Sequence, residues 1–143
     1  MADAYSGLTQ ESLNEYESIL GIPKNRIAVI PNGVDCKKFY YSSEERAKIR
    51  KEFDVKDGCK VFITVASVQK RKGQLAFLKM LSMLDIDFQY WIVGKGPDEE
   101  AILQYVEENG LQGKVRMLGY KTANELYKYY SAADIYALSL IHI

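Results

Sequence analysis

The sequence is poor in the residues that most often build metal centres and covalent catalytic sites. It contains two cysteines, Cys36 and Cys59, and one histidine, His142. The two thiols show no metal-ligand spacing, which favours reduced cysteines over a disulfide or a metal site. A lone histidine next to the last residue also argues against a Ser-His-Asp triad. These residues therefore predict neither a metal centre nor a nucleophilic triad.

The sequence also lacks an excess of either charge and any long apolar run. Lys plus Arg and Asp plus Glu both number 19, so no general attraction to nucleic acid or to an anionic membrane is expected. No run is long enough to span a bilayer and no signal-peptide pattern is present, so we expect a cytoplasmic protein. The 143 residues, 48% of them hydrophobic, fit one globular domain.

Short β-rich runs alternate along the chain with amphipathic helical runs. Strands are predicted at residues 26–30, 60–67, 88–94, 114–118 and 134–138, and helices at 8–21, 42–53, 73–84, 97–110 and 123–133. Two of the strands are apolar almost throughout, which is typical of strands buried on both faces of a parallel sheet. The alternation predicts an α/β fold with a doubly wound parallel sheet, whose ligands bind beyond the carboxyl ends of the strands.

Local signals mark turns and helix starts. The segment PNGVD, residues 31–35, predicts a turn because Asn-Gly tolerates positive φ. Ser42 with Glu45, and Thr122 with Glu125, predict capping boxes at two helix N-termini.

The loop ASVQKRKG, which follows the first buried strand, gathers positive charge before a helix. The predicted first turn of that helix, residues 74–77, contains no acid that could occupy the free N–H groups of its N-terminus. Lys72 adds a charge beside these groups, and Gly73 allows close backbone approach. Such a loop fits a phosphate site, and a solvated basic turn fits it equally.

The loop VGKGPDEE follows the second buried strand. Gly94 and Gly96 predict a sharp turn that leaves room for an uncharged part of a ligand. The acids Asp98, Glu99 and Glu100 are expected to satisfy the helix N-terminus and to repel a phosphate. The loop is no dinucleotide fingerprint, since position 99 is not glycine, and no Walker motif occurs elsewhere. A tight strand-to-helix turn is the alternative.

The loop LGYKTANE follows the third strand of this series. Its backbone groups before Thr122 could pair with the edge of a base, and a plain connecting turn is the alternative.

Five motifs occur in an order that resembles glycosyltransferase family 4. They are VIPNGVD at 29–35, VASVQKRKG at 65–73, IVGKGPDEE at 92–100, VRMLGY at 115–120 and YYSAADIYAL at 129–138. That family has the GT-B fold, two Rossmann-like domains with the active site between them. The resemblance implies that residues 1–31 end the N-terminal acceptor domain and that residues 32–137 form a partial nucleotide-sugar-binding domain.

The resemblance also implies a site for the donor diphosphate. Lys72 matches the second member of the family's basic pair, and the first member, often Arg, is Ser67 here. This departure weakens the site or shifts the work to Lys70 or Arg71, beside Gly73.

Further donor-binding and connecting positions follow from the same resemblance. Gly94 and Gly96 match the G-x-G-P turn beside the donor. The segment whose backbone meets the nucleotide base matches Gly119, Tyr120 and Lys121. The crossing between the two domains matches Asn32, Gly33 and Asp35.

The implied parent enzyme is a retaining glycosyltransferase that uses a nucleotide diphosphate sugar and no metal or other cofactor. Its acceptor would be a glycan or lipid of polysaccharide, glycolipid or cell-envelope synthesis, with peripheral membrane association and no nucleic-acid partner. The family's Glu-x7-Glu segment is missing after ADIYAL, so no catalytic residue is assigned and this fragment is expected to be inactive. A nicotinamide-dependent Rossmann oxidoreductase and a non-catalytic α/β binding domain are the alternatives.

The last six residues, LSLIHI at 138–143, depart from the family's usual continuation. They match the translation of CTGTCTCTTATACACATC, an adaptor of transposase-based sequencing libraries. We hypothesise that this tail is adaptor read-through, and a native apolar strand is the alternative. An unbroken LSLIHI at the native locus would contradict the hypothesis.

Overall fold

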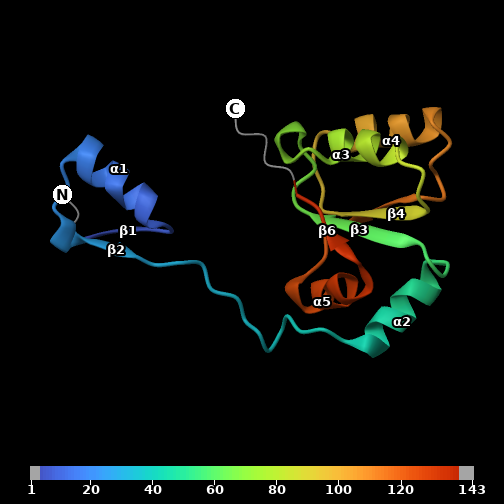
Figure 1. The fold of residues 1–143 in the computed structure, drawn as a ribbon, viewed down its shortest axis with the longest axis horizontal. Coiled ribbons are helices and arrows are strands. Elements are labelled where there is room, and N and C mark those ends of the chain that lie inside the picture. Colours follow the sequence, from blue (N-terminus) through green and yellow to red (C-terminus); the bar gives the residue numbers. More distant parts are fainter. Residues whose placement is uncertain (1–3, 139–143) are drawn as a thin grey trace. The chain divides into compact units, whose positions relative to one another are not determined.

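The computed structural model describes residues 4–138, and the chain divides into two compact units, Met1–Asp35 and Cys36–Ile143. In the first unit, β1 (Tyr5–Gly7) pairs in parallel with β2 (Ile27–Val29), and α1 (Gln10–Leu20) connects them (Figure 1). Helix α1 ends at Gly21, whose φ of 63° provides the left-handed cap that the sequence predicts.

Residues 31–35, which end the first unit, form no helix or strand. The turn predicted at 31–35 is wrong, because no turn is found there and Gly33 has no positive φ. The first turn comes later, at residues 36–38. An Asn-Gly pair permits a left-handed backbone but does not require one, and here no neighbouring strand pairing demands it. The assignment of residues 1–31 to an acceptor domain stays a prediction.

The second unit contains the doubly wound parallel sheet that the alternating pattern predicts. Its elements are α2 (Ser43–Glu52), β3 (Lys60–Val65), a 3-10 turn (Lys70–Lys72), α3 (Gln74–Ser82), β4 (Phe88–Val93), α4 (Glu99–Glu108), β5 (Val115–Gly119), α5 (Ala123–Ala132) and β6 (Ile135–Tyr136). The strand order is β5-β4-β3-β6, and every pairing is parallel.

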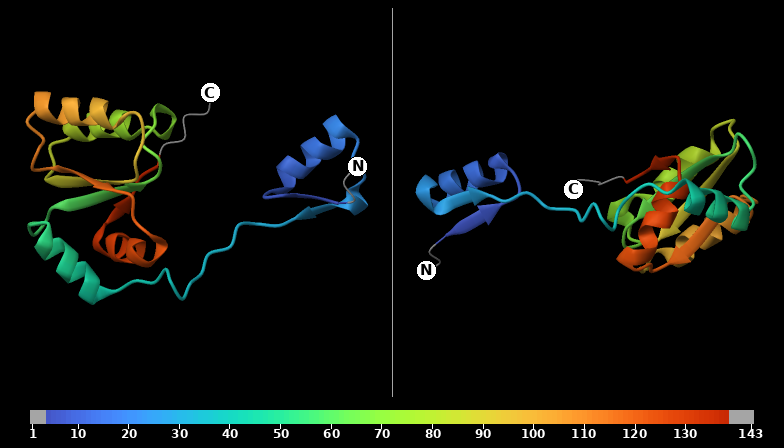
Figure 2. Two further views of the ribbon diagram at one scale, coloured as in Figure 1. Left: turned by 180° about the vertical axis from the view of Figure 1, so that it is seen from behind. Right: turned by 90° about the horizontal axis from the view of Figure 1, so that it is seen from below.

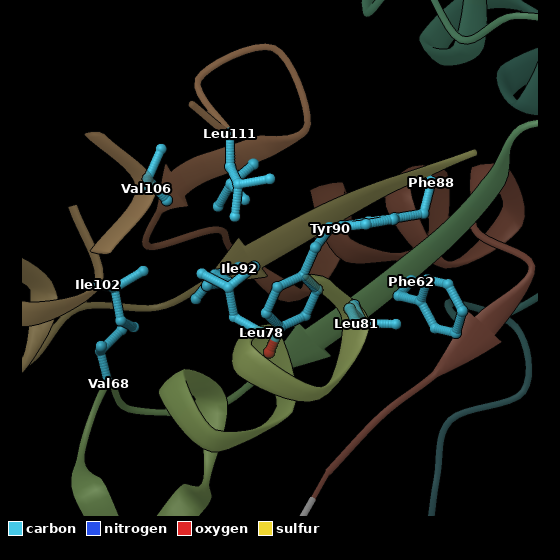
Figure 3. Packing of buried hydrophobic residues seen from close by; sticks show 11 residues of the cluster. Phe62, Val68, Leu78, Leu81, Phe88, Tyr90, Ile92, Ile102, Val106 and Leu111 are labelled. Atoms are coloured by element: carbon cyan, nitrogen blue, oxygen red, sulfur yellow. The ribbon is translucent and has the colours of Figure 1, made fainter. Parts of the chain in front are cut away.

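Alternating side chains of the central strands build two apolar layers, one on each face of the sheet. Helices α3 and α4 cover one face, and α2 and α5 cover the other (Figures 1 and 2). On the first face, Tyr90 and Ile92 lie among residues of α3 and α4 (Figure 3). On the second face, Trp91 is fully buried. Its ring packs edge-on against the ring of Phe53, with 5.0 Å between the ring centroids. All six residues of β4 are buried, as its composition predicts.

Two arginines of α2 hold this helix against the end of α5. Arg46 donates to Asp134 at 2.6 Å and to the last carbonyls of α5, and Arg50 donates to Asp134 at 3.1 Å. Burial by itself would raise the pKa of Asp134, but hydrogen bonds from Arg46, the Val61 N–H and Arg50 outweigh it and lower the pKa.

The predicted capping boxes have different outcomes. At α5, the carboxylate of Glu125 accepts from the Thr122 N–H at 2.9 Å, which confirms the box. At α2, Ser42 Oγ accepts from the Glu45 N–H, but the Ser42 N–H donates to Ser131 Oγ at 3.0 Å instead of to Glu45. The reciprocal half of this box is therefore wrong, because a buried hydroxyl from α5 takes the place of the glutamate.

Candidate functional site

A cavity of about 510 Å³ opens at the carboxyl ends of β3, β4 and β5. We call it the strand-end cavity. Its lining residues are Val65, Ala66, Ser67, Val93, Gly94, Lys95, Tyr120, Lys121, Ala123 and Leu126. Strand ends of a parallel sheet are where ligands of such folds bind, because the connecting loops diverge there and leave a crevice.

The charge of the strand-end cavity is positive. Lys95 and Lys121 line it, and none of its lining residues is acidic. Lys121 Nζ lies 5.5 Å from the ring centroid of Tyr129, an arrangement that permits a cation–π contact. Glu125 stands nearby, and the hydrogen bonds from the Thr122 hydroxyl and N–H, aided by Lys121, lower its pKa. The cavity can therefore attract anionic or acceptor-rich ligands.

Gly94 and Gly96 hold the loops of β3 and β4 close together. A Cβ at Gly94 would lie 2.0 Å from the carbonyl oxygen of Ala66, and one at Gly96 would lie 2.1 Å from that of Val68. The interpretation that these glycines leave room for a ligand is therefore wrong on the side where a Cβ would point. Neighbouring backbone fills that space, and the Val68 N–H donates to the Lys95 carbonyl at 3.0 Å.

The acids after Gly96 bind loop backbone instead of capping α4. Asp98 stands at the N-cap position of α4 but makes no side-chain cap bond there. Its carboxylate accepts from the Lys70 N–H, and Glu99 accepts from the Gly96 N–H at 2.7 Å. The expectation that these acids satisfy the α4 N-terminus is therefore wrong for Asp98, because the basic loop lies within its reach.

The basic triplet forms one turn of 3-10 helix directly before α3. Gly73 closes that turn with a φ of 70°, and the N-terminus of α3 has neither a side-chain cap nor an acid in its first turn. Buried Gln74 ties this helix start to the loop after β3 by donating to the Ser67 carbonyl at 2.9 Å. Sequence reasoning expected the uncapped helix start, but it did not foresee that Asp98 brings a carboxylate to the loop.

The predicted donor-binding residues fall into three groups. Ser67, Gly94, Tyr120 and Lys121 line the strand-end cavity. Lys70 and Gly73 line a second cavity of about 370 Å³ between the starts of α3 and α4, together with Asp98. The residues that line neither of these two cavities are Arg71, Lys72, Gly96 and Gly119. The structure therefore brings together only part of the predicted set.

Three other predicted positions belong to the first unit. Asn32, Gly33 and Asp35 lie at its end, in a stretch without helix or strand. Their role at a crossing between domains stays a prediction.

Lys95 is the one charged residue in the lining of this cavity that was not among the predicted donor-binding residues. It stands between the two glycines of the G-x-G turn, so its position directly after a buried strand was the available signal. A Cβ placed on Gly119 would lie 3.7 Å from Lys95 Cε, which shows that the lysine side chain extends from the end of β4 toward the end of β5.

Comparison with known proteins decides the family. The chain matches the model of the glycosyl transferases group 1 over residues 45–142. It belongs to this family. The match favours glycosyl transfer over the oxidoreductase and the non-catalytic domain that the sequence left open. It also takes in most of the LSLIHI segment, of which residues 139–143 lie outside the described part of the chain.

Curated glycosyltransferases resemble this chain over most of its length. It is 27% identical over 125 residues to the putative colanic acid biosynthesis glycosyltransferase WcaL of Salmonella typhimurium, covering 85% of this chain and 29% of that protein. It is 26% identical over 140 residues to the GDP-mannose-dependent alpha-(1-6)-phosphatidylinositol monomannoside mannosyltransferase of Mycolicibacterium smegmatis, covering 96% and 36%. The chain thus spans about a third of the length of these relatives.

Solved glycosyltransferases share the fold. Anabaena HepE in complex with UDP and glucose superposes with a TM-score of 0.80 at 20% identity, over 96% of this chain and 38% of that chain. WaaG, a glycosyltransferase of lipopolysaccharide biosynthesis, gives 0.75 at 18% identity, over 92% and 36%. This likeness confirms the predicted fold class, a partial GT-B domain with a Rossmann-like sheet. In the described part of this chain, every helix is too short or too polar to cross a bilayer.

Proposed function

We propose that this chain is the donor-binding part of a retaining glycosyltransferase. The parent enzyme transfers a sugar from a nucleotide diphosphate sugar to the hydroxyl of a glycan or lipid acceptor. The observation that carries the proposal is the strand-end cavity, which holds two lysines and no acid in a chain of the glycosyl transferases group 1. The names of similar proteins support such a donor, since one is GDP-mannose-dependent and another was solved with UDP and glucose.

The chemistry that this chain contributes is electrostatic. A departing nucleoside diphosphate develops negative charge, which fixed cations and helix N–H groups stabilise. Lys72 stands one residue before Gly73, at the uncapped N-terminus of α3, where its charge adds to the positive end of the helix dipole. We assign the diphosphate to this helix start, with Lys70 and Arg71 as further cations. In this proposal lysine and arginine charges replace a metal ion, and no other cofactor takes part.

The names of similar proteins suggest a cellular role for the parent enzyme. Relatives carry names of colanic acid, lipopolysaccharide core and glycolipid synthesis. We place the parent enzyme in the cytoplasm, in the synthesis of a cell-envelope glycan, with peripheral membrane attachment where the acceptor is a lipid. Because the chain contains no residue to which we assign catalysis, we expect it to bind the donor nucleotide and not to turn it over.

Calorimetry of the purified chain tests the proposal. We expect UDP or GDP to bind and NAD not to bind. Lys72→Ala should weaken binding of the nucleoside diphosphate about tenfold, the loss of one charge-assisted hydrogen bond, and should leave binding of the nucleoside nearly unchanged. Lys48→Ala, on the exposed surface of α2, is the matched control and should change neither.

Two results would contradict this proposal in different ways. Binding of NAD but of neither diphosphate would overturn the glycosyltransferase function. Equal losses for nucleoside and nucleoside diphosphate in Lys72→Ala would remove Lys72 from the diphosphate site.

A further inference from the structure

The β5 side of the strand-end cavity offers more hydrogen-bond donors than free acceptors. Two backbone carbonyls that flank this side without lining the cavity are already engaged within the chain. Gly119 accepts from the Gly94 N–H at 2.8 Å, and Thr122 accepts from the Leu126 N–H at 3.1 Å. The side chains of Lys95 and Lys121 offer only donors, because an ammonium group carries three N–H bonds and no lone pair. Donor groups therefore outnumber free acceptors at this side.

The remaining polar groups on this side can each donate or accept, so they do not distinguish a keto group from an amino group on a ligand. Within residues 4–138, the N–H and C=O of Tyr120 and Lys121 make no hydrogen bond, so each residue offers one donor and one acceptor. Such a pair can adapt to either edge of a base. The hydroxyls of Ser67 and Tyr120 can also donate or accept. Selectivity must therefore come from a group that can only donate.

Lys95 is better placed than Lys121 to act on a ligand. The Lys121 ammonium lies 5.5 Å from the ring centroid of Tyr129, and its charge adds to the hydrogen bonds from Thr122 that lower the pKa of Glu125. Lys95 is exposed, and its ammonium makes no ion pair or hydrogen bond within residues 4–138. Its side chain lines the strand-end cavity and extends toward Gly119, at the end of β5.

We propose that Lys95 makes the strand-end cavity selective for nucleotides whose base carries a keto oxygen at the 4-position of a pyrimidine or the 6-position of a purine. Uracil, thymine, guanine and hypoxanthine are such bases. The ammonium of Lys95 donates to that oxygen, whereas cytosine and adenine present an amino group there, whose N–H bonds a lysine cannot accept and whose positive edge it repels. The inference rests on the proposed function, because it assumes that a nucleotide occupies this cavity.

Two matched pairs of nucleotides isolate this contact. UDP and CDP differ only at the 4-position of the pyrimidine and the protonation of the adjacent ring nitrogen. IDP and ADP differ in the same way at the 6-position of the purine. Within a pair the ribose and diphosphate are identical, so the ratio of the two affinities cancels every contact to those parts.

The experiment measures the four affinities by calorimetry for the wild-type chain and for two variants. We expect the wild type to favour UDP over CDP, and IDP over ADP, by about tenfold, as one charge-assisted hydrogen bond provides. Lys95→Met keeps an unbranched stem of nearly the same length, removes its donors and should bring both ratios close to one. Lys95→Glu turns the donor into an acceptor and should reverse both ratios, even though its charge weakens all four affinities.

Lys48→Met is the control for a change of one surface lysine, and the fluorescence of buried Trp91 checks that each variant is folded. Ratios near one in the wild type, or ratios that Lys95→Met leaves unchanged, would overturn the inference while nucleotide binding stands. Failure of all four nucleotides to bind would overturn the proposed function, and the inference with it. The two failures are therefore distinguishable.

Discussion

Gly94→Ala tests how closely the two central loops must approach. Gly94 has a φ of 137°, and a Cβ added to it would lie 2.0 Å from the Ala66 carbonyl oxygen and 2.9 Å from its carbon. Relief of this overlap requires the two backbones to separate by about 1 Å or more, given the usual distance of non-bonded contacts. A shift of that size breaks the hydrogen bonds from the Ala66 N–H to Val93 and from the Gly94 N–H to Gly119, which are 3.0 and 2.8 Å long.

The expected loss of stability is the sum of the lost hydrogen bonds and the backbone strain. Two buried backbone hydrogen bonds are worth about 1 kcal/mol each, and a non-glycine residue at positive φ costs a further ~1–2 kcal/mol. We expect Gly94→Ala to lower the free energy of unfolding by about 3–4 kcal/mol. That is a large fraction of the ~5–15 kcal/mol by which domains are usually stable.

A second glycine at positive φ allows the cost of the contact with Ala66 to be measured apart from the cost of backbone strain. Gly58 has a φ of 81°, and nothing lies within 4 Å of the Cβ it would carry. Gly58→Ala should therefore cost only the strain, about 1–2 kcal/mol. Urea unfolding followed by the fluorescence of Trp91, the single tryptophan, reports the stability of this unit. Equal losses for the two variants would refute the reasoning, because they would leave nothing to the contact with Ala66.

Two further substitutions test buried polar groups. Asp134→Asn should lower stability by about 2 kcal/mol at neutral pH, through loss of charged bonds to Arg46 and Arg50. Because the pKa of Asp134 is lowered, its contribution is present above the ordinary 3.8 and is lost as the pH falls below it, so urea midpoints of the variant should lack this acid-dependent loss. Burial raises the pKa of Tyr90 to about 12, against a smaller lowering by the bond to Thr64. Wild-type stability should therefore fall as the pH rises from 10 toward 12, and unfolding curves of Tyr90→Phe should lack this component.

The parts of the fold that short sequence windows determine were predicted well. The strands at β3 and β4 are apolar on both faces, and this composition alone places them in the middle of a parallel sheet. The capping box at α5 also depends on two residues three positions apart, Thr122 and Glu125. Such signals are complete within one segment, so no knowledge of the rest of the chain is needed.

The contacts that could not be predicted join distant segments. Asp98 binds the Lys70 N–H across 28 positions, and Ser131 takes the Ser42 N–H across 89. In both cases the local pattern supplied a plausible partner in the same helix, and the folded chain supplied a different one. The role of Gly94 was misjudged for the same reason, since the carbonyl that excludes its Cβ belongs to Ala66.

The G-x-G turn after β4 thus divides two tasks between neighbouring residues. The glycines allow backbone to meet backbone, because the carbonyls of the β3 loop occupy the space where their Cβ atoms would point. A ligand in the strand-end cavity would therefore meet side-chain chemistry from this turn mainly through Lys95, which is exposed and lines the cavity. Substitution at either glycine should reduce stability and ligand binding together. Substitution at Lys95 should change which base is preferred and leave the unfolding midpoint where it was, so the two tasks can be separated by measuring both quantities on the same variants.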